Sequence, residues 1–184
     1  MKLHWRGPQY HGTENLHHHI EKNTILGQTM HKGNPTPEQY IGWLSFKARF
    51  FDGVDRYIPP SCRRGERYRA DIVAMGAKPV TLDAAERHLE WLIQPGLSEP
   101  EAERRRTGTA YVCVGSVFGS LEIRSRMMRA GMQYPMAALD FSERETELAY
   151  LNQLRHRADC IHEAMVTFRR MTECCEQIIE IYGG

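Results

Sequence analysis

The stretch TPEQYIGWLSFKARFFDGVDRY, residues 36–57, carries the strongest fold signal in the sequence. Thr36 can cap a helix, Pro37 suits the first helical position, and Gln39 stands where a capping box is completed. The residues that then recur at helical spacing are Tyr40, Trp43, Leu44, Lys47, Phe50, Phe51 and Val54. The pattern predicts a long amphipathic helix from Pro37 to about Tyr57, which the following prolines end.

Helical patterns also dominate the rest of the chain. The N-terminal arm (1–12) contains Gly and Pro and is predicted to be irregular. Helices are predicted over about 13–33, 67–75, 81–94 and 109–129, with a solvated helix start at 99–106. A last helix, in which a bend can be accommodated, is predicted over 142–181. Thr13, Thr81 and Ser142 are the expected caps. No run combines strand alternation with turn chemistry. We therefore expect one all-α domain over 1–184, a helical bundle.

Composition narrows the classes of partner and compartment. The chain has 184 residues with 24 Lys+Arg against 23 Asp+Glu, so its net charge favours neither nucleic acid nor an anionic membrane as a partner. Its five Cys are odd in number and form no CxxC pair, which indicates neither a disulfide framework nor a zinc ribbon. No apolar run approaches the ~18 residues that a membrane helix needs. These features predict a cytoplasmic protein with reduced thiols.

The segment TENLHHHIE, residues 13–21, contains three adjacent histidines. Successive helical residues point about 100° apart, so the three cannot face one ligand together. His17 and Glu21 are four residues apart and share a helix face. A His that binds a metal usually needs an acceptor for its other ring nitrogen, and Glu21 could be that acceptor. The alternative is an exposed polar face that carries a chance run of histidines.

A second segment, GSVFGS at residues 115–120, places two glycines one turn apart inside a predicted helix. Each interior Gly costs about 1 kcal/mol relative to Ala, so a compensating role is expected. Gly115 and Gly119 would clear a stripe of backbone, which Ser116 and Ser120 flank. Such a stripe lets a flat ligand approach the helix or lets the helix bend. The alternative is close helix packing through small residues.

Together these segments resemble the heme oxygenase family. TENLHHHIE, then MHKGNPTPEQY followed by Trp43-Leu44, then AYVCVGSVFGS and EAMVTF occur in the family's order and spacing, over about residues 13–172. The glycine-rich segment is more similar to the bacterial, phytochrome-associated branch than to the mammalian one. The resemblance implies a single-domain helical bundle with a heme pocket between the first helix and the glycine-rich distal helix.

The resemblance also assigns roles to residues. His17 matches the iron ligand and Glu21 its hydrogen-bonded partner, while Gly115 and Gly119 match the distal-helix glycines. Ser116 stands where mammalian enzymes have an Asp that organises water.

Three further assignments are less direct. Ser120 replaces a usual second Gly of the distal pair. The family's propionate-binding residues have no clear match, and Tyr111 and Arg144 are the candidates chosen for that role.

The activity that the resemblance implies is oxidative cleavage of heme, which is both substrate and cofactor. Dioxygen is consumed, and the products are biliverdin, carbon monoxide and ferrous iron. Electrons would come from an external donor such as ferredoxin or a reductase, since the chain has no flavin or nicotinamide fingerprint. A bilin reductase or a phytochrome could take the product.

Two other functions fit parts of the sequence. A non-heme di-iron oxidase would use Glu14-x-x-His17 and Asp159-x-x-His162, with Glu86 or Glu122 as a further ligand. A non-catalytic heme or bilin carrier would use the same His17 without turnover.

Overall fold

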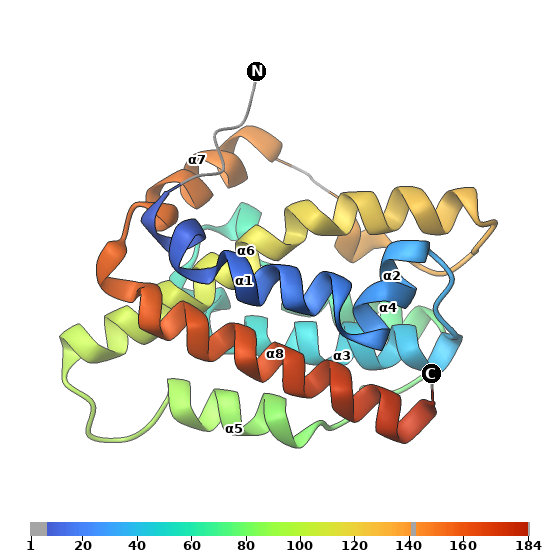
Figure 1. Cartoon of the computed structure of the whole chain (residues 1–184), viewed down its shortest axis with the longest axis horizontal. Helices are drawn as coiled ribbons and strands as arrows, with labels where there is room; N and C mark the ends of the chain where they lie inside the picture. Colours follow the sequence, from blue (N-terminus) through green and yellow to red (C-terminus); the bar gives the residue numbers. More distant parts are fainter. Residues whose placement is uncertain (1–6, 141–142, 184) are drawn as a thin grey trace.

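The computed structural model describes residues 7–140 and 143–183, which form α-helices and short 3-10 helices with no strand among them (Figure 1). The α-helices are α1 (Pro8–Lys22), α2 (Ile25–Lys32), α3 (Pro37–Asp52), α4 (Gly65–Ala74), α5 (Asp83–Leu92), α6 (Glu99–Arg129), α7 (Arg144–Arg155) and α8 (Ile161–Tyr182). The 3-10 helices are η1 (Asp55–Tyr57), η2 (Pro60–Cys62), η3 (Ala137–Leu139) and η4 (Ala158–Cys160). The all-α prediction is confirmed.

Helix α3 begins with the capping box that the sequence predicts. The Gln39 backbone N–H donates to Thr36 Oγ1 at 3.2 Å, and the Thr36 N–H donates to Gln39 Oε1 at 3.0 Å. The helix ends at Asp52, earlier than the predicted Tyr57, and the chain continues into η1. The turn at Gly53 lies against α5, where an added Cβ would come within 2.4 Å of Leu92 Cδ2. Packing against α5 therefore favours glycine at this turn.

Helix α1 begins earlier than predicted. Pro8 takes the first helical position, and the Thr13 hydroxyl donates to the Gln9 carbonyl at 2.7 Å inside the helix. The expectation of an irregular arm is thus wrong from Pro8 onward, and Thr13 is not a cap. Residues 1–6 of that arm lie outside the described residues.

The helix predicted over 13–33 is two helices. Thr24 adopts an extended backbone conformation, and its Oγ1 accepts the Gly27 N–H at 3.0 Å, so it caps α2. Gly33, with φ of 78°, closes α2 in the left-handed conformation. This break turns α2 away from α1. The two helices can therefore form two separate walls of one cavity.

Three further predictions are corrected or refined. Helix α5 has Leu82 at its N-cap position, so Thr81 is not the cap. The solvated start at 99–106 and the helix from Thr109 are one continuous α6. The last helix is divided by η4 into α7 and α8, while its expected cap, Ser142, lies outside the described residues.

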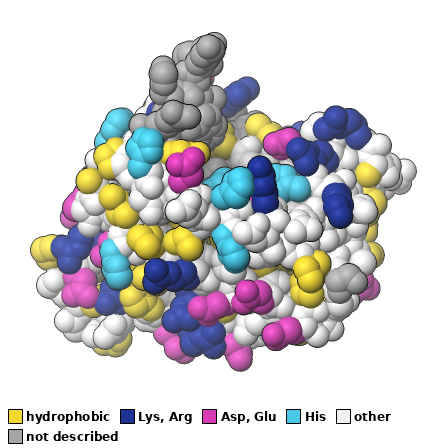
Figure 2. All heavy atoms as spheres, viewed as in Figure 1, with side chains coloured by type: hydrophobic (Ala, Val, Ile, Leu, Met, Phe, Trp, Pro, Cys, Tyr) yellow, Lys and Arg dark blue, Asp and Glu magenta, His cyan; other side chains and the backbone are white. Residues whose placement is uncertain are grey.

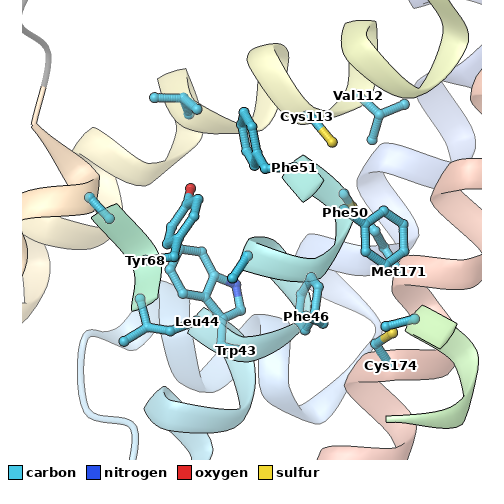
Figure 3. Packing of buried hydrophobic residues seen from close by; sticks show 14 of the residues in the cluster. Trp43, Leu44, Phe46, Phe50, Phe51, Tyr68, Val112, Cys113, Met171 and Cys174 are labelled. Carbon is cyan, nitrogen blue, oxygen red and sulfur yellow. The ribbon is translucent and has the colours of Figure 1, made fainter. Parts of the chain in front are cut away.

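Helix α3 lies in the middle of the bundle, against α4, α5, α6 and α8. Figure 3 shows its aromatic residues between Tyr68 of α4, Cys113 of α6 and Met171 of α8. Trp43 meets the Tyr68 ring edge-on at a centroid distance of 6.0 Å, and Phe50 stacks on His88 at 4.3 Å. Fully burying one such ring stabilises the fold by about 1.5–3 kcal/mol. The apolar face predicted for residues 40–54 is thus the core of the bundle.

All five cysteines are buried free thiols: Cys62, Cys113, Cys160, Cys174 and Cys175. Within the described ranges, no helix combines the length and the apolar character that crossing a membrane requires.

Candidate functional site

A cavity opens between α1, α2, α3, α6 and α8. Its empty volume is about 650 Å³, with the open solvent at its mouth included. Its walls are mainly apolar. The lining residues are His17, Ile20, Glu21, Leu26, Gly27, Met30, His31, Trp43, Phe46, Lys47, Ser116, Gly119, Ile123, Phe168, Met171 and Cys175. The sequence-predicted residues that it brings together are therefore His17, Glu21, Ser116 and Gly119.

Two histidines flank one carboxylate at the mouth of the cavity. Glu21 Oε1 lies 3.5 Å from His17 Nε2 and 3.8 Å from His31 Nε2. These side chains are 25–44% exposed, so the group stands between solvent and the interior. Figure 2 shows histidines gathered on the face that α1 and α2 form. An imidazole that turns one nitrogen toward Glu21 keeps its second nitrogen for a metal.

Of the three adjacent histidines, His17 alone lines the cavity. Its ring meets the Phe168 ring edge-on at a centroid distance of 5.7 Å. His18 and His19 are exposed, and His19 Nδ1 contacts the Asn23 amide at 3.3 Å. The helical periodicity argument thus selects the histidine that the structure places inward.

The protonation states at the mouth suit a metal ligand. Burial lowers the pKa of His17, and the nearby Lys47 charge adds to this, although Glu21 opposes it. His17 is therefore neutral at pH 7, the form that binds metal. Burial alone would raise the pKa of Glu21, but His31 and His17 together hold it below its ordinary value. Glu21 is accordingly an ionised acceptor between two imidazoles.

His31 is a functional candidate that the sequence pattern did not indicate. It lies fourteen positions after His17, so its approach to Glu21 depends on the turn that Thr24 makes between α1 and α2. A continuous helix over 13–33, as predicted, would not bring His31 back toward Glu21. The cap residue Thr24 was the signal that could have indicated the break.

The opposite wall is the backbone of α6. A Cβ added to Gly119 would lie 3.8 Å from Glu21 Oε1, so this bare backbone faces α1 directly. One turn earlier, the Ser116 hydroxyl donates to the Cys113 carbonyl at 2.7 Å and lines the cavity. A hydroxyl with its proton engaged in this way still offers its lone pairs to a water or ligand donor.

The other half of the glycine stripe faces elsewhere. A Cβ on Gly115 would meet Leu151 Cδ1 of α7 at 3.7 Å, because residues four apart in a helix are still rotated by about 40°. Ser120 is completely buried, and its hydroxyl donates to the Ser116 carbonyl at 2.9 Å. Gly115 and Ser120 thus do not line the cavity, and for Gly115 the helix-packing alternative describes the geometry.

The two residues chosen for propionates are also away from the cavity. Tyr111 is half-buried on α6 and contacts Thr13 of α1. Arg144 is exposed as the first residue of α7. Neither residue lines the cavity. Tyr111 points from α6 toward the N-terminal part of α1, and Arg144 lies on α7, which is next to that end of α1 in Figure 1.

The floor of the cavity holds a buried lysine. Lys47 of α3 is 5% exposed and lies among Trp43, Phe46, Met171 and Cys175. Its Nζ sits over the rings of Trp43 and Phe46, at 5.4 and 5.7 Å from their centroids. The sequence placed Lys47 correctly on the apolar face of its helix, but nothing in the pattern distinguished it from an exposed lysine.

The ligands expected for a di-iron site are dispersed. Glu14 accepts the Tyr10 hydroxyl at 3.2 Å, Asp159 pairs with Arg157, and Glu86 pairs with Arg49. Glu122 pairs with Arg126, and His162 is exposed. Across the described part of the chain, no three His, Cys, Asp or Glu side chains are grouped to hold a metal. The geometry gives this alternative no shared site.

The fold is that of a heme oxygenase bundle. The structure superposes on the crystal structure of heme oxygenase-1 from the cyanobacterium Synechocystis sp. PCC6803 in complex with heme, with a TM-score of 0.72. The match covers 95% of this chain and 94% of that one at 15% sequence identity. No protein-family model and no curated protein sequence matches the chain. The similarity therefore establishes the fold.

Proposed function

We propose that the protein is a heme oxygenase, which binds heme in this cavity and cleaves it to biliverdin, carbon monoxide and ferrous iron. One observation carries the proposal: His17, with Glu21 as its carboxylate partner, lines the same mainly apolar cavity as the bare Gly119 backbone of α6. A flat ligand that carries a metal needs a ligand for the metal, such as His17, and a wall that it can approach closely, such as the backbone at Gly119. The similarity to a heme-bound heme oxygenase structure supports the same assignment.

The residues present fit a heme. The walls are apolar, as a porphyrin ring requires, and the lining includes the Phe168 and Phe46 rings. Bound heme would supply the iron at which dioxygen is reduced and the carbon skeleton that is oxidised. His17 would hold the iron through one nitrogen, while Glu21 would accept a hydrogen bond from the other and fix the ring's tautomer.

The opposite wall would control what enters beside the iron. The missing side chain of Gly119 keeps this wall low, since an added Cβ would already touch Glu21 Oε1 at 3.8 Å. The Ser116 hydroxyl could hold a water that passes protons toward the reacting centre. The mainly apolar walls would exclude bulk water, which limits side reactions.

The partners proposed are those that the chemistry requires. Electrons would come from ferredoxin or a reductase, and the bilin would pass to a bilin reductase or a phytochrome. We place this activity in the cytoplasm, where reduced thiols persist.

Titration with hemin followed by reductant and oxygen tests the proposal. A Soret band that decays into a broad red biliverdin absorption supports the enzyme. A heme complex that stays unchanged under these conditions indicates the carrier instead. If the protein takes up no heme and instead binds two irons per chain, the result would favour the alternative hypothesis of a non-heme di-iron oxidase.

Glu21 and Glu14 give a sharper test of the same site. We expect Glu21→Gln to keep the His17 ligand but to lose roughly 10- to 100-fold in heme affinity or turnover, because a neutral amide polarises the imidazole less. Resonance Raman of the ferrous complex should show a weakened iron–histidine bond. Glu14→Gln is the control, since Glu14 is exposed on the same helix, and it should match wild type. Loss of activity in Glu14→Gln with a normal Glu21→Gln would contradict the assignment.

Gly119 tests the distal wall. A leucine at this position would fill the space between α6 and Glu21, so we expect Gly119→Leu to bind heme through His17 but to turn over more slowly, on the order of 10- to 100-fold. A changed biliverdin isomer ratio is the second readout. Gly115→Ala is the control, because its Cβ makes an ordinary contact with Leu151 at 3.7 Å. Unchanged rate and isomer pattern in Gly119→Leu would mean that Gly119 does not face the ligand.

A further inference from the structure

A second hollow lies between η1, the connection from α5 to α6 and the first turns of α6. This connection stands at one end of the bundle (Figure 1). The empty volume of the hollow is about 550 Å³, with the open solvent at its mouth included. It shares no lining residue with the cavity between α1 and α6. Among the described residues that line it, the charged ones are Arg56 and Arg106, and none is acidic.

The two arginines make the hollow positive, and the protein neutralises them only in part. Their guanidinium carbons lie over the Tyr57 ring, at 4.6 Å from its centroid for Arg56 and 4.5 Å for Arg106. Arg106 also pairs with Glu99, whose side chain is 80% exposed. Arg56 forms no ion pair with a carboxylate in the described part of the chain. Its cation–π contact uses the charge of the guanidinium but leaves N–H donors for an acceptor.

The rest of the lining is largely apolar, and it exposes two large hydrophobic side chains to solvent. Ile93 is 55% exposed and Tyr57 is 44% exposed, and both line the hollow together with Leu92 and Leu97. In the described ranges, six large hydrophobic side chains are exposed in this way, and two of them gather here. Exposed apolar surface that is concentrated in one hollow favours a ligand with an apolar body.

The wall that the α5–α6 connection forms is held in place from behind. Arg105 Nη1 donates to the Trp91 carbonyl and to Gln94 Oε1, and its guanidinium lies over the Trp91 ring at 4.9 Å from the centroid. Gln94 is part of the lining. A ligand would therefore meet a wall that is already ordered, so binding would cost less conformational entropy.

We propose that this hollow binds a small amphipathic carboxylate. The carboxylate pairs with Arg56 and is attracted by Arg106, while the apolar body of the ligand covers Ile93 and Tyr57. A guanidinium suits this group because it offers parallel N–H donors to the two carboxylate oxygens. The inference does not depend on the proposed function, since the hollow and the cavity that would hold heme have separate linings.

A pair of probes that differ in charge tests the proposal. 2-Naphthoate and the uncharged 2-naphthamide are titrated into the whole chain without hemin, and binding is followed by two-dimensional amide NMR and by calorimetry. We expect naphthoate to shift the amide signals of Gly53 and Gly96, which line the hollow. These shifts should appear at lower concentration than any shift of Gly27 and Gly119, which line the other cavity. Naphthoate should bind about fivefold or more tightly than naphthamide.

Two variants separate the charged from the apolar contribution. Arg56→Gln should lose about fivefold or more in affinity for naphthoate and should leave the affinity for naphthamide within about twofold. Ile93→Ala should weaken both probes by about three- to tenfold, because it removes apolar contact area. Both side chains are exposed, so both variants should keep the wild-type fold.

Arg129→Gln and Val73→Ala are the matched controls. Both residues are exposed and lie outside the hollow, on α6 and α4, so these variants should leave both affinities unchanged. Naphthoate that binds no more tightly than naphthamide, or that fails to shift Gly53 and Gly96 at millimolar concentration, would overturn the site. So would equal losses of naphthoate affinity in Arg56→Gln and Arg129→Gln.

The result is independent of heme uptake. A chain that takes up no hemin but binds naphthoate through Arg56 would lose the proposed function and keep this site. A chain that cleaves heme but shows no Arg56-dependent binding would keep the proposed function and lose this site.

Discussion

His17→Ala should abolish axial ligation of heme. His17 is the one member of the histidine run that lines the cavity, and its lowered pKa keeps it neutral and ready to bind iron at pH 7. His31 also lines the cavity, but its carboxylate neighbour, Glu21, lies on another helix. His17 has Glu21 one turn later on its own helix. We expect the visible spectrum of the hemin complex to change from that of a histidine-bound heme to that of a weakly held one, with turnover lost. Added imidazole should restore part of the ligation.

His18→Ala and His19→Ala are the controls, because both side chains are exposed. His31→Ala is the most stringent control, because His31 also lines the cavity and contacts Glu21 and is therefore the alternative ligand. Each should retain the spectrum of the wild-type complex. If His31→Ala removes the ligand and His17→Ala does not, α2 rather than α1 holds the iron.

Glu147→Ala should cause the largest loss of stability. Arg64 Nη2 donates to Glu147 Oε1 at 2.6 Å with both side chains almost fully buried, and Arg64 Nη1 also donates to the Ser61 carbonyl. Removing Glu147 leaves a guanidinium without its counter-charge, which typically costs 3–5 kcal/mol. For a chain of this length we expect Tm to fall by roughly 6–20 °C. Thermal unfolding followed by circular dichroism measures the effect.

Glu145→Ala is the matched control on the same helix, because its side chain is exposed, and it should change the stability by less than about 0.5 kcal/mol. The double variant Arg64→Met, Glu147→Leu should recover most of the loss, since no buried charge remains. A small effect of Glu147→Ala would mean that water reaches Arg64.

The core of this fold follows from local sequence signals. The capping box at Thr36 and the apolar period after it predicted both the start of α3 and the face that it buries. The pairing of His17 with Glu21 followed from the same helical geometry. In both cases the residues that interact lie within a turn or two of each other, so the pattern contains the information.

The parts that the sequence did not predict depend on contacts between distant residues. His31 reaches Glu21 only because Thr24 breaks the helix, and Gly115 faces Leu151 because of where α7 lies. Lys47 has the spacing of a core residue, but whether its ammonium escapes to solvent depends on α8 and α6. Helical periodicity assigns a face and does not say which neighbour covers it.

The buried cysteines have a consequence for the motions of the molecule. Burial raises the pKa of Cys62 and Cys160 to about 11 and that of Cys113 and Cys175 to about 12, and it also raises that of Cys174. A thiol reagent needs the thiolate, so it reacts with these residues only when a helix transiently opens. They are distributed from η2 to α8, and Cys175 also borders the cavity. The rate at which each sulfur is modified under native conditions therefore reports the local opening free energy of its own segment, and at Cys175 it also reports how far a ligand holds that segment closed.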